Sequence, residues 1–324
     1  MPLLEVKNLE VRFAMRRQEL IALRDVSFEI SEGERLGIVG ESGAGKSVAA
    51  FSILNLISKP GYISAGEILF EGQDLTRLDP QQMRSIRGNR VSMIFQDPMM
   101  TLNPVLTVGT QMTEALHAHR EISDNEAKQI AIEGLAQVHI PSPETRFDQY
   151  PHELSGGMRQ RIVIATALLT EPSLIIADEP TTALDVTIQA EIMDLLLELC
   201  ESSEVGLILI THDLGVIAQV TQRALVMYAG RVVEEGDTRD IVEQAYHPYT
   251  RGLIEALPQR TTPGKRLNQI AGAMPMLDSI PAGCAFNPRC PLVMDVCRSD
   301  MPGYTSIGRS RVACHAQPRG KHGD

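Results

Sequence analysis

A glycine-rich stretch near the N-terminus has the residue types and the spacing of a phosphate-binding loop. The pattern is G-x-x-x-x-G-K-S, formed by Gly40, Glu41, Ser42, Gly43, Ala44, Gly45, Lys46 and Ser47. Glycines reach backbone angles closed to other residues, so the loop can curl around an anion with its N–H groups pointing inward. We expect Lys46 to reach the β- and γ-phosphates of a nucleotide and Ser47 to bind Mg²⁺.

The segments on either side have the pattern that such a loop needs. Leu36–Val39 is an apolar run short enough for one buried strand, and residues from Val48 onward can continue as a helix. The N-terminus of a helix carries partial positive charge, which favours a phosphate group. A glycine-rich turn that matches by chance is the alternative. We predict a nucleotide site formed by residues 40–47 together with Val48.

Two carboxylates end a second apolar run. Residues 174–177 are apolar and are followed by Asp178 and Glu179. Asp178 can reach the Mg²⁺ shell that also contains Ser47. Glu179 is then placed to polarise an attacking water, and general-base work of this kind contributes about 10²–10⁴ in rate. The alternative is a strand followed by an acidic turn.

Two further polar residues follow predicted strands. Gln96 comes after the strand 91–95, and His212 follows the strand 207–210. Ligands of parallel α/β sheets lie at the carboxyl ends of the strands, where Asp178 also ends its strand. An amide oxygen of Gln96 could bind Mg²⁺ or the water, and a neutral His212 could contact the γ-phosphate. A solvated turn residue and a structural histidine are the alternatives.

Ser155, Gly156 and Gly157 begin a predicted helix in the segment Leu154–Gln160, and this is a second anion-binding geometry. An ordinary helix cap would use the same serine. A second phosphate site in one chain makes sense if it serves a nucleotide held by another subunit. Upstream, Phe13 could stack on an adenine ring or pack in the core.

These residues are carried by alternating strands and helices. We predict an edge strand at 3–13, strands at 23–30 and 67–70, helices at 79–87 and across 104–150, and a long helix after Asp185. Residues 224–227 and 231–234 form a predicted hairpin about Ala229 and Gly230. The order predicts an α/β fold with an inserted helical subdomain.

The composition argues against several classes of protein. The chain has 324 residues and a formal net charge of −11, so a nucleic-acid-binding footprint is absent overall. No apolar run approaches the ~20 residues that span a bilayer. The first residues have neither the basic nor the apolar region of a signal peptide. We expect a cytosolic chain that binds no nucleic acid.

In order along residues 3–240, the motifs resemble those of the ATP-binding cassette family. They are the Walker A loop 40–47, Gln96 of the Q-loop, the signature 154–160 with Gln160 as its last residue, Asp178 and Glu179 of Walker B, Asp185 of the D-loop and His212 of the switch. The resemblance implies a RecA-like P-loop NTPase core with an antiparallel β subdomain and a helical subdomain at about 98–160.

The same resemblance implies how the site is completed. Such domains work as head-to-tail pairs, so ATP on the Walker A loop of one subunit would meet Ser155 and Gly157 of another. Phe13 matches the position of the adenine-stacking aromatic, Gln96 would lie near a membrane partner, and Asp185 would lie at the nucleotide interface. The expected ligands are ATP and Mg²⁺, with Ser47, Gln96 and Asp178 as the Mg²⁺ residues.

The segments His247–Pro258 and Asn287–Pro291 resemble the ATPases of oligopeptide, dipeptide and nickel importers. The resemblance implies an ABC domain at 1–257, an extension at 258–324, a sibling ATPase, two transmembrane permease subunits and an extracytoplasmic solute-binding protein. The chain would lie peripherally on the cytoplasmic face of the membrane and drive peptide uptake. Import of nickel or another small solute, and a soluble ATPase acting on DNA or ribosomes, are the alternatives. A non-hydrolysing partner is disfavoured because all catalytic positions are filled.

Cysteines gather at the C-terminal end of the chain. Cys200 fits a core thiol of the long helix, and the other four are Cys284, Cys290, Cys297 and Cys314. A cytosolic chain argues against disulfides. Zinc favours tighter spacing, and a [4Fe–4S] cluster tolerates varied spacing between four thiolates. Free thiols are the remaining possibility. The family resemblance implies the iron–sulfur cluster, which we expect to be structural.

Overall fold

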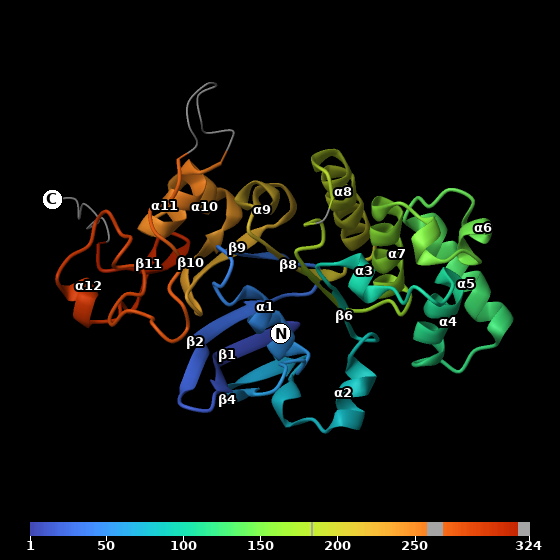
Figure 1. Ribbon diagram of the computed structural model, residues 1–324, viewed down its shortest axis with the longest axis horizontal. Coiled ribbons are helices and arrows are strands. Elements are labelled where there is room, and N and C mark those ends of the chain that lie inside the picture. The colour runs from blue at the N-terminus through green and yellow to red at the C-terminus, as the bar shows by residue number, and fades with distance from the viewer. Residues whose placement is uncertain (183, 258–267, 317–324) are drawn as a thin grey trace. The chain divides into compact units, whose positions relative to one another are not determined.

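The computed structural model in Figure 1 describes residues 1–182, 184–257 and 268–316. Its contacts divide the chain into two compact units. Unit 1 consists of residues 1–3, 30–34 and 77–209, and unit 2 of residues 4–29, 35–76 and 210–324. The predicted extension 258–324 therefore lies partly outside the described residues, because 258–267 and 317–324 are not described.

An antiparallel sheet begins unit 2. Its strands, in spatial order, are β2 (Glu19–Ile30), β1 (Leu4–Ala14), β4 (Gly61–Phe70) and β5 (Gln73–Asp74), and Figure 1 shows the first three side by side. The prediction of an edge strand at 3–13 is wrong, because β1 lies between β2 and β4. The apolar residues Leu4, Val6, Leu9 and Val11 are buried. A pattern of this kind indicates that one face of a strand is buried, but it does not indicate whether the strand has a neighbouring strand on each side.

A second set of strands in unit 2 carries the glycine-rich loop. β3 (Arg35–Val39) runs parallel to β9 (Arg223–Tyr228), and β9 turns back into β10 (Arg231–Asp237). This hairpin about Ala229 and Gly230 was predicted. Two strands that were not predicted follow in space, β12 (Ser310–Ala313) against β10 and β11 (Tyr304–Ile307) at the outside.

The helices of unit 2 are short. They are α1 (Lys46–Ile53), the 3₁₀ turn η1 (Leu75–Arg77) at the junction with unit 1, α9 (Leu214–Val220), α10 (Thr238–Gln244), α11 (Pro248–Glu255) and α12 (Val296–Ser299).

In unit 1, β6 (Val91–Ile94) and β7 (Leu174–Asp178) run parallel, with Val91 opposite Leu174. β8 (Gly206–Thr211) follows β7 in the strand order, and its residues up to Leu209 belong to this unit. Every residue of β7 and β8 is buried. Continuous apolar runs are typical of parallel strands covered on both faces, which is why the sequence predicted these three.

Among its described residues, unit 1 also contains eight helical segments, and Figure 1 shows α4 to α7 gathered together. They are α2 (Pro80–Ile86), α3 (Pro98–Thr101), α4 (Val108–His117), α5 (Asp124–Gln137), α6 (Pro143–Phe147), η2 (Pro151–Glu153), α7 (Gly156–Leu168) and α8 (Val186–Ser202). Asp79 begins α2 with a full capping box, and Thr107 and Ser123 cap α4 and α5. Helical periodicity places Val108, Met112 and Leu116 on one buried face. None of the described helices combines the length and apolar character needed to cross a bilayer.

Candidate functional site

The loop between β3 and α1 has the conformation that its glycines predict. Gly43 and Gly45 adopt φ angles of +84° and +101°, in the left-handed region that favours glycine. At Gly40 the constraint is close approach, since a Cβ atom there would lie 2.4 Å from the carbonyl oxygen of Met227. Strand, loop and helix therefore follow one another as expected.

Lys46, the first residue of α1, is held by its own loop. The residue is only 5% exposed. Its Nζ donates to the carbonyl oxygens of Gly40, at 2.9 Å, and Glu41, at 3.2 Å. The ammonium group thus lies inside the curl of the loop, where a phosphate oxygen would compete for the same donors.

Two of the predicted catalytic residues meet in unit 1. Gln96 Nε2 donates to Glu179 Oε2 at 3.1 Å, and Thr182 Oγ1 donates to the same oxygen at 2.8 Å. Glu179 follows β7 with a φ angle of +46°, a conformation that costs a non-glycine residue about 1–3 kcal/mol and is typical of functional sites. Asp178, the last residue of β7, is buried. The carboxylate of Glu179 is thus oriented by two neighbours.

The second predicted phosphate site begins α7. Ser155 is exposed, and its Oγ accepts the Met158 N–H at 3.3 Å, so the serine is a helix cap as well as a candidate ligand. A Cβ on Gly157 would lie 3.0 Å from Ile188. Asp185 is also exposed and caps α8.

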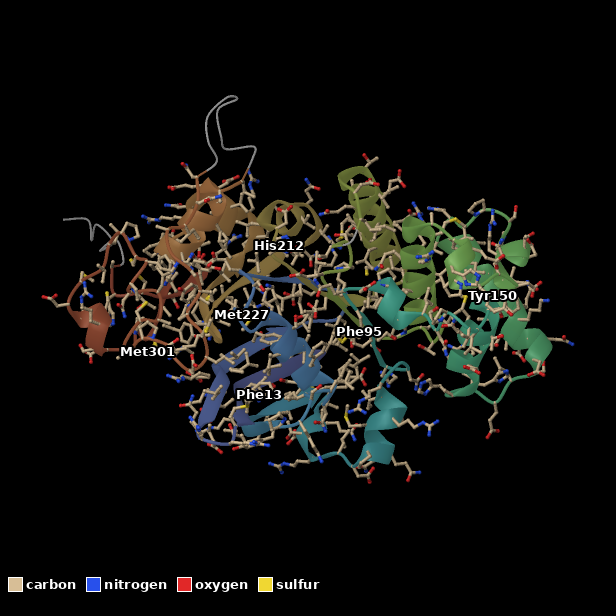
Figure 2. All side chains as sticks on the ribbon, viewed as in Figure 1. Phe13, Phe95, Tyr150, His212, Met227 and Met301 are labelled. Carbon is tan, nitrogen blue, oxygen red and sulfur yellow. The ribbon has the colours of Figure 1, made fainter. Side chains whose placement is uncertain are left out.

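Gln160 lies deeper than the other residues of its motif. It is fully buried on α7, and its two amide atoms have no hydrogen-bond partner among the described residues. In unit 2, Phe13 on β1 is half-buried, and His212 directly after β8 is exposed (Figure 2). A Cβ on Gly61 would lie 2.7 Å from the Phe13 ring, so this glycine makes room for the aromatic side chain. The nucleotide roles of Phe13, Gln160 and His212 stay predictions.

The four C-terminal cysteines do not form a metal site of the expected kind. Among the residues that the structure describes, no group of three or more His, Cys, Asp or Glu side chains could hold a metal ion. The thiols nevertheless lie in one region. The Cys284 N–H donates to the Cys297 carbonyl at 2.9 Å. Burial, together with smaller effects of the other three thiols, raises the pKa of Cys314 to about 11. Cys200 is buried on α8, as predicted.

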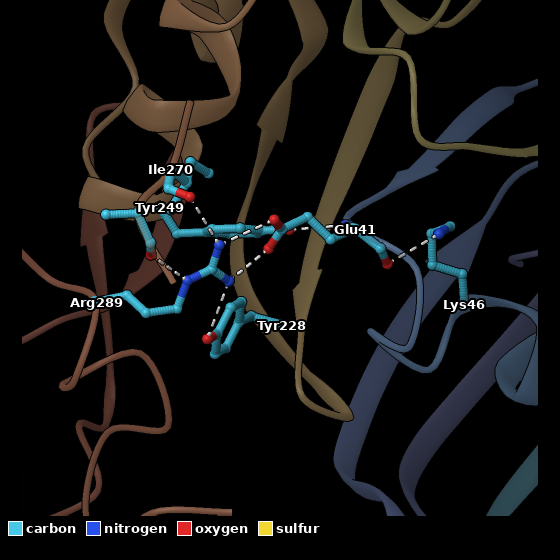
Figure 3. A network of polar contacts seen from close by, with 7 residues as sticks. Glu41, Lys46, Tyr228, Tyr249, Ile270 and Arg289 are labelled. Carbon is cyan, nitrogen blue, oxygen red and sulfur yellow. Dashed lines mark hydrogen bonds and ion pairs between the residues drawn. The ribbon is translucent and has the colours of Figure 1, made fainter. Parts of the chain in front are cut away.

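Sequence reasoning missed two residues next to the glycine-rich loop. Arg289 forms an ion pair with Glu41, and Tyr249 on α11 accepts a hydrogen bond from the Glu41 N–H (Figure 3). The motif around Asn287–Pro291 was recognised as a family feature, but nothing in the spacing indicated what its arginine contacts.

Comparisons with known proteins agree with this geometry. The family model described as "ABC transporter" matches residues 23–182, and "Oligopeptide/dipeptide transporter, C-terminal region" matches residues 233–297. The dipeptide transport ATP-binding protein DppD of Bacillus subtilis is 52% identical over 305 residues, which are 93% of this chain and 90% of the relative. DppD of Haemophilus influenzae is 48% identical over 97% of this chain and 96% of its own length.

Solved structures show the same fold. A dimeric ATP-binding cassette, MJ0796, in a post-hydrolysis state with ADP and phosphate superposes with a TM-score of 0.65 at 30% identity, covering 73% of this chain and 99% of the other. The chain belongs to the ABC transporter family, within the group of peptide-import ATP-binding proteins.

Proposed function

We infer that this chain is the ATP-hydrolysing subunit of an ABC importer for peptides. The observation that carries the inference is the pair of matches in one chain, an ABC domain followed by the oligopeptide/dipeptide C-terminal region, with relatives of nearly the same length named for dipeptide transport. The left-handed conformation of Gly43 and Gly45 and the position of Lys46 within the loop support ATP binding by residues 40–47.

We assign the following roles to the predicted residues of the hydrolytic site. The loop 40–47 and Val48 hold the triphosphate, Lys46 contacts its terminal phosphates, and Ser47, Gln96 and Asp178 are the Mg²⁺ residues. Mg²⁺, when bound, offsets the negative charge of the phosphate oxygens. Glu179 orients and polarises the attacking water, while His212 contacts the γ-phosphate. Support comes from the contact between Gln96 and Glu179, which joins the carboxyl ends of the two parallel strands β6 and β7.

The transport assignment has a direct test. The full chain, tagged and purified from detergent-solubilised membranes, is expected to bring with it a sibling ATPase and two integral membrane subunits. Uptake of a labelled dipeptide should require the intact chain and should stop with Lys46→Ala. Capture of ribosomes or DNA that stimulate ATP hydrolysis, without membrane subunits, would contradict the proposal. Uptake of nickel but not of dipeptides would reassign the solute.

We also propose that Ser155, Gly156 and Gly157 bind a nucleotide held by the sibling subunit. The exposure of Ser155 and the dimeric solved relative support this. In a Glu179→Gln background, ATP should cause the two ATPases to associate, as measured by light scattering. Ser155→Arg should prevent that association, whereas Ser85→Arg, at an exposed serine on α2, should not. Equal association of the two arginine variants would refute the arrangement.

The group held by the four cysteines is a separate proposal. Their common segment and mutual electrostatic influence support an iron–sulfur cluster, although the thiols are not arranged as metal ligands. Iron, zinc and acid-labile sulfide are measured in anaerobically purified protein. Four irons and four sulfides per chain are expected. Zinc without iron would indicate a zinc site instead. If the protein contains neither metal, the four cysteines are free thiols. The peripheral position on the cytoplasmic face follows from the membrane partners proposed above.

A further inference from the structure

Glu41, the second residue of the glycine-rich loop, has all of its polar groups engaged (Figure 3). Its N–H donates to Tyr249 Oη at 2.8 Å, and its carbonyl accepts from Lys46 Nζ at 3.2 Å and from the Ala44 N–H at 3.1 Å. Its carboxylate is held by both terminal nitrogens of Arg289, at 2.7 and 3.0 Å. The loop is therefore fixed from outside, by residues far along the chain.

The Arg289 guanidinium uses all three of its nitrogens in this arrangement. Nε donates to the Ala271 carbonyl at 2.9 Å, and the terminal nitrogens reach Tyr228 Oη and the Ile270 carbonyl, both at 3.4 Å, in addition to the carboxylate. The side chain is 5% exposed. A planar fork with five N–H donors is a property of arginine, and a lysine could not replace it.

Aromatic rings enclose the ion pair. Tyr228, Tyr249 and Phe286 contact one another, with ring centroids 4.7 to 5.4 Å apart, and the guanidinium carbon lies 5.9 Å from the ring centroids of Tyr228 and Phe286. The hydrogen bonds to Glu41 raise the pKa of Arg289, so the guanidinium stays charged. In such surroundings, removing one partner leaves the other charge poorly compensated.

Charge explains why the pair matters for a loop that receives phosphates. Without its partner, the carboxylate of Glu41 would be an uncompensated negative charge on the loop itself, and it would repel the negative charges of a triphosphate bound by that loop. The same C-terminal segment approaches the loop a second time, since a Cβ on Gly43 would lie 3.7 Å from the Met274 side chain.

We propose that Arg289 is a positioning residue for nucleotide binding, which acts by neutralising and orienting Glu41 of the phosphate loop. The segment around Cys290 thereby becomes part of the ATP site. This inference rests on the proposed function, namely that residues 40–47 bind ATP.

A double-mutant cycle tests the proposal in the full chain. The dissociation constant of MgATP is measured by calorimetry for the wild type, Arg289→Met, Glu41→Gln and the double variant. We expect Arg289→Met to weaken binding about tenfold when Glu41 is present and less than about threefold in the Glu41→Gln background. In steady-state kinetics of the assembled complex, KM for ATP should rise while kcat stays within about twofold.

A matched control and an alternative variant keep the outcome clear. Arg239→Met removes an arginine from the exposed pair with Glu243 and should leave ATP affinity unchanged. If Arg289→Met yields no soluble protein, Arg289→Lys is put through the same cycle. Losses of equal size in both backgrounds, or no loss at all, would overturn the positioning role. The proposed function fails separately, if the wild type does not bind ATP or if Lys46→Ala binds it equally well.

Discussion

A buried histidine makes the stability of unit 2 sensitive to acid. His247 is 1% exposed, and its Nδ1 accepts the Tyr249 N–H at 3.1 Å, which caps α11. Burial, together with the smaller effect of the positive charge of Arg251, lowers the pKa of His247 to about 3. The buried Glu234 faces the same turn by accepting the His247 N–H at 3.0 Å, and burial raises its pKa. The ring of His247 therefore stays neutral in the folded protein at pH 5.

The sign and size of the effect follow from linkage. In the unfolded chain His247 titrates near its ordinary pKa of about 6.5. Between that pKa and the lower pKa of the folded state, the ring binds a proton in the unfolded chain but not in the folded chain. Stability is present above that pKa and is lost as the pH falls from about 6.5 towards 3. At pH 5.0, about 1.5 pH units below the unfolded value, the loss amounts to about 2 kcal/mol.

His247→Asn isolates this contribution, because asparagine is a good helix cap and does not titrate. Urea unfolding, followed by tyrosine fluorescence at pH 7.5 and pH 5.0, gives the free energy of unfolding of each protein. The wild type should lose about 2 kcal/mol more than His247→Asn between the two pH values. His152→Asn, at an exposed histidine, should lose as much as the wild type. Equal losses of the wild type and His247→Asn would refute the reasoning.

Three further changes test the site and the fold. Glu179→Gln should lower ATP turnover about 10²–10⁴-fold in a phosphate-release assay while ATP binding is kept, and an unchanged rate would reject Glu179 as the general base. Gly109→Ala should destabilise the chain by about 1–3 kcal/mol in urea unfolding, because its Cβ would lie 2.2 Å from the Phe147 ring. Helix propensity alone predicts a gain in stability of about 1 kcal/mol. A stabilised variant would therefore show that the Phe147 ring moves to accommodate the methyl group. Asp79→Ala should cost about 1 kcal/mol, since the carboxylate accepts two N–H groups at the start of α2, and no change would show that the cap is dispensable.

The sequence predicted the parts of the site that depend on local pattern. Apolar runs located the parallel strands β3, β6, β7 and β8. The polar residues that directly follow such strands were expected to lie at the carboxyl-end edge of the sheet. That expectation grouped Gln96, Asp178 and His212 at the carboxyl ends of parallel strands. The hydrogen bond from Gln96 to Glu179, the residue after Asp178, was not predicted and comes from the structure.

Prediction failed where contacts cross long stretches of chain. The strands β11 and β12 lack a strong alternation, and they form because β10 offers an open edge. Arg289 and Glu41 are 248 residues apart, and no periodicity links two residues so distant. The cysteine spacing permitted several ligands and did not fix the arrangement of the four thiols. Local propensity carries no information on such tertiary contacts.

The separation of Glu41 and Arg289 along the chain determines how long after Glu41 the ribosome synthesises Arg289. Ribosomes add about 5–20 residues per second, so the 248 residues between the two partners take roughly 12–50 s to synthesise. Throughout that interval the nascent chain displays its phosphate loop without the arginine that neutralises it. On the proposal made above, a chain that ends before Arg289 keeps its loop in that state and binds ATP more weakly than the full chain.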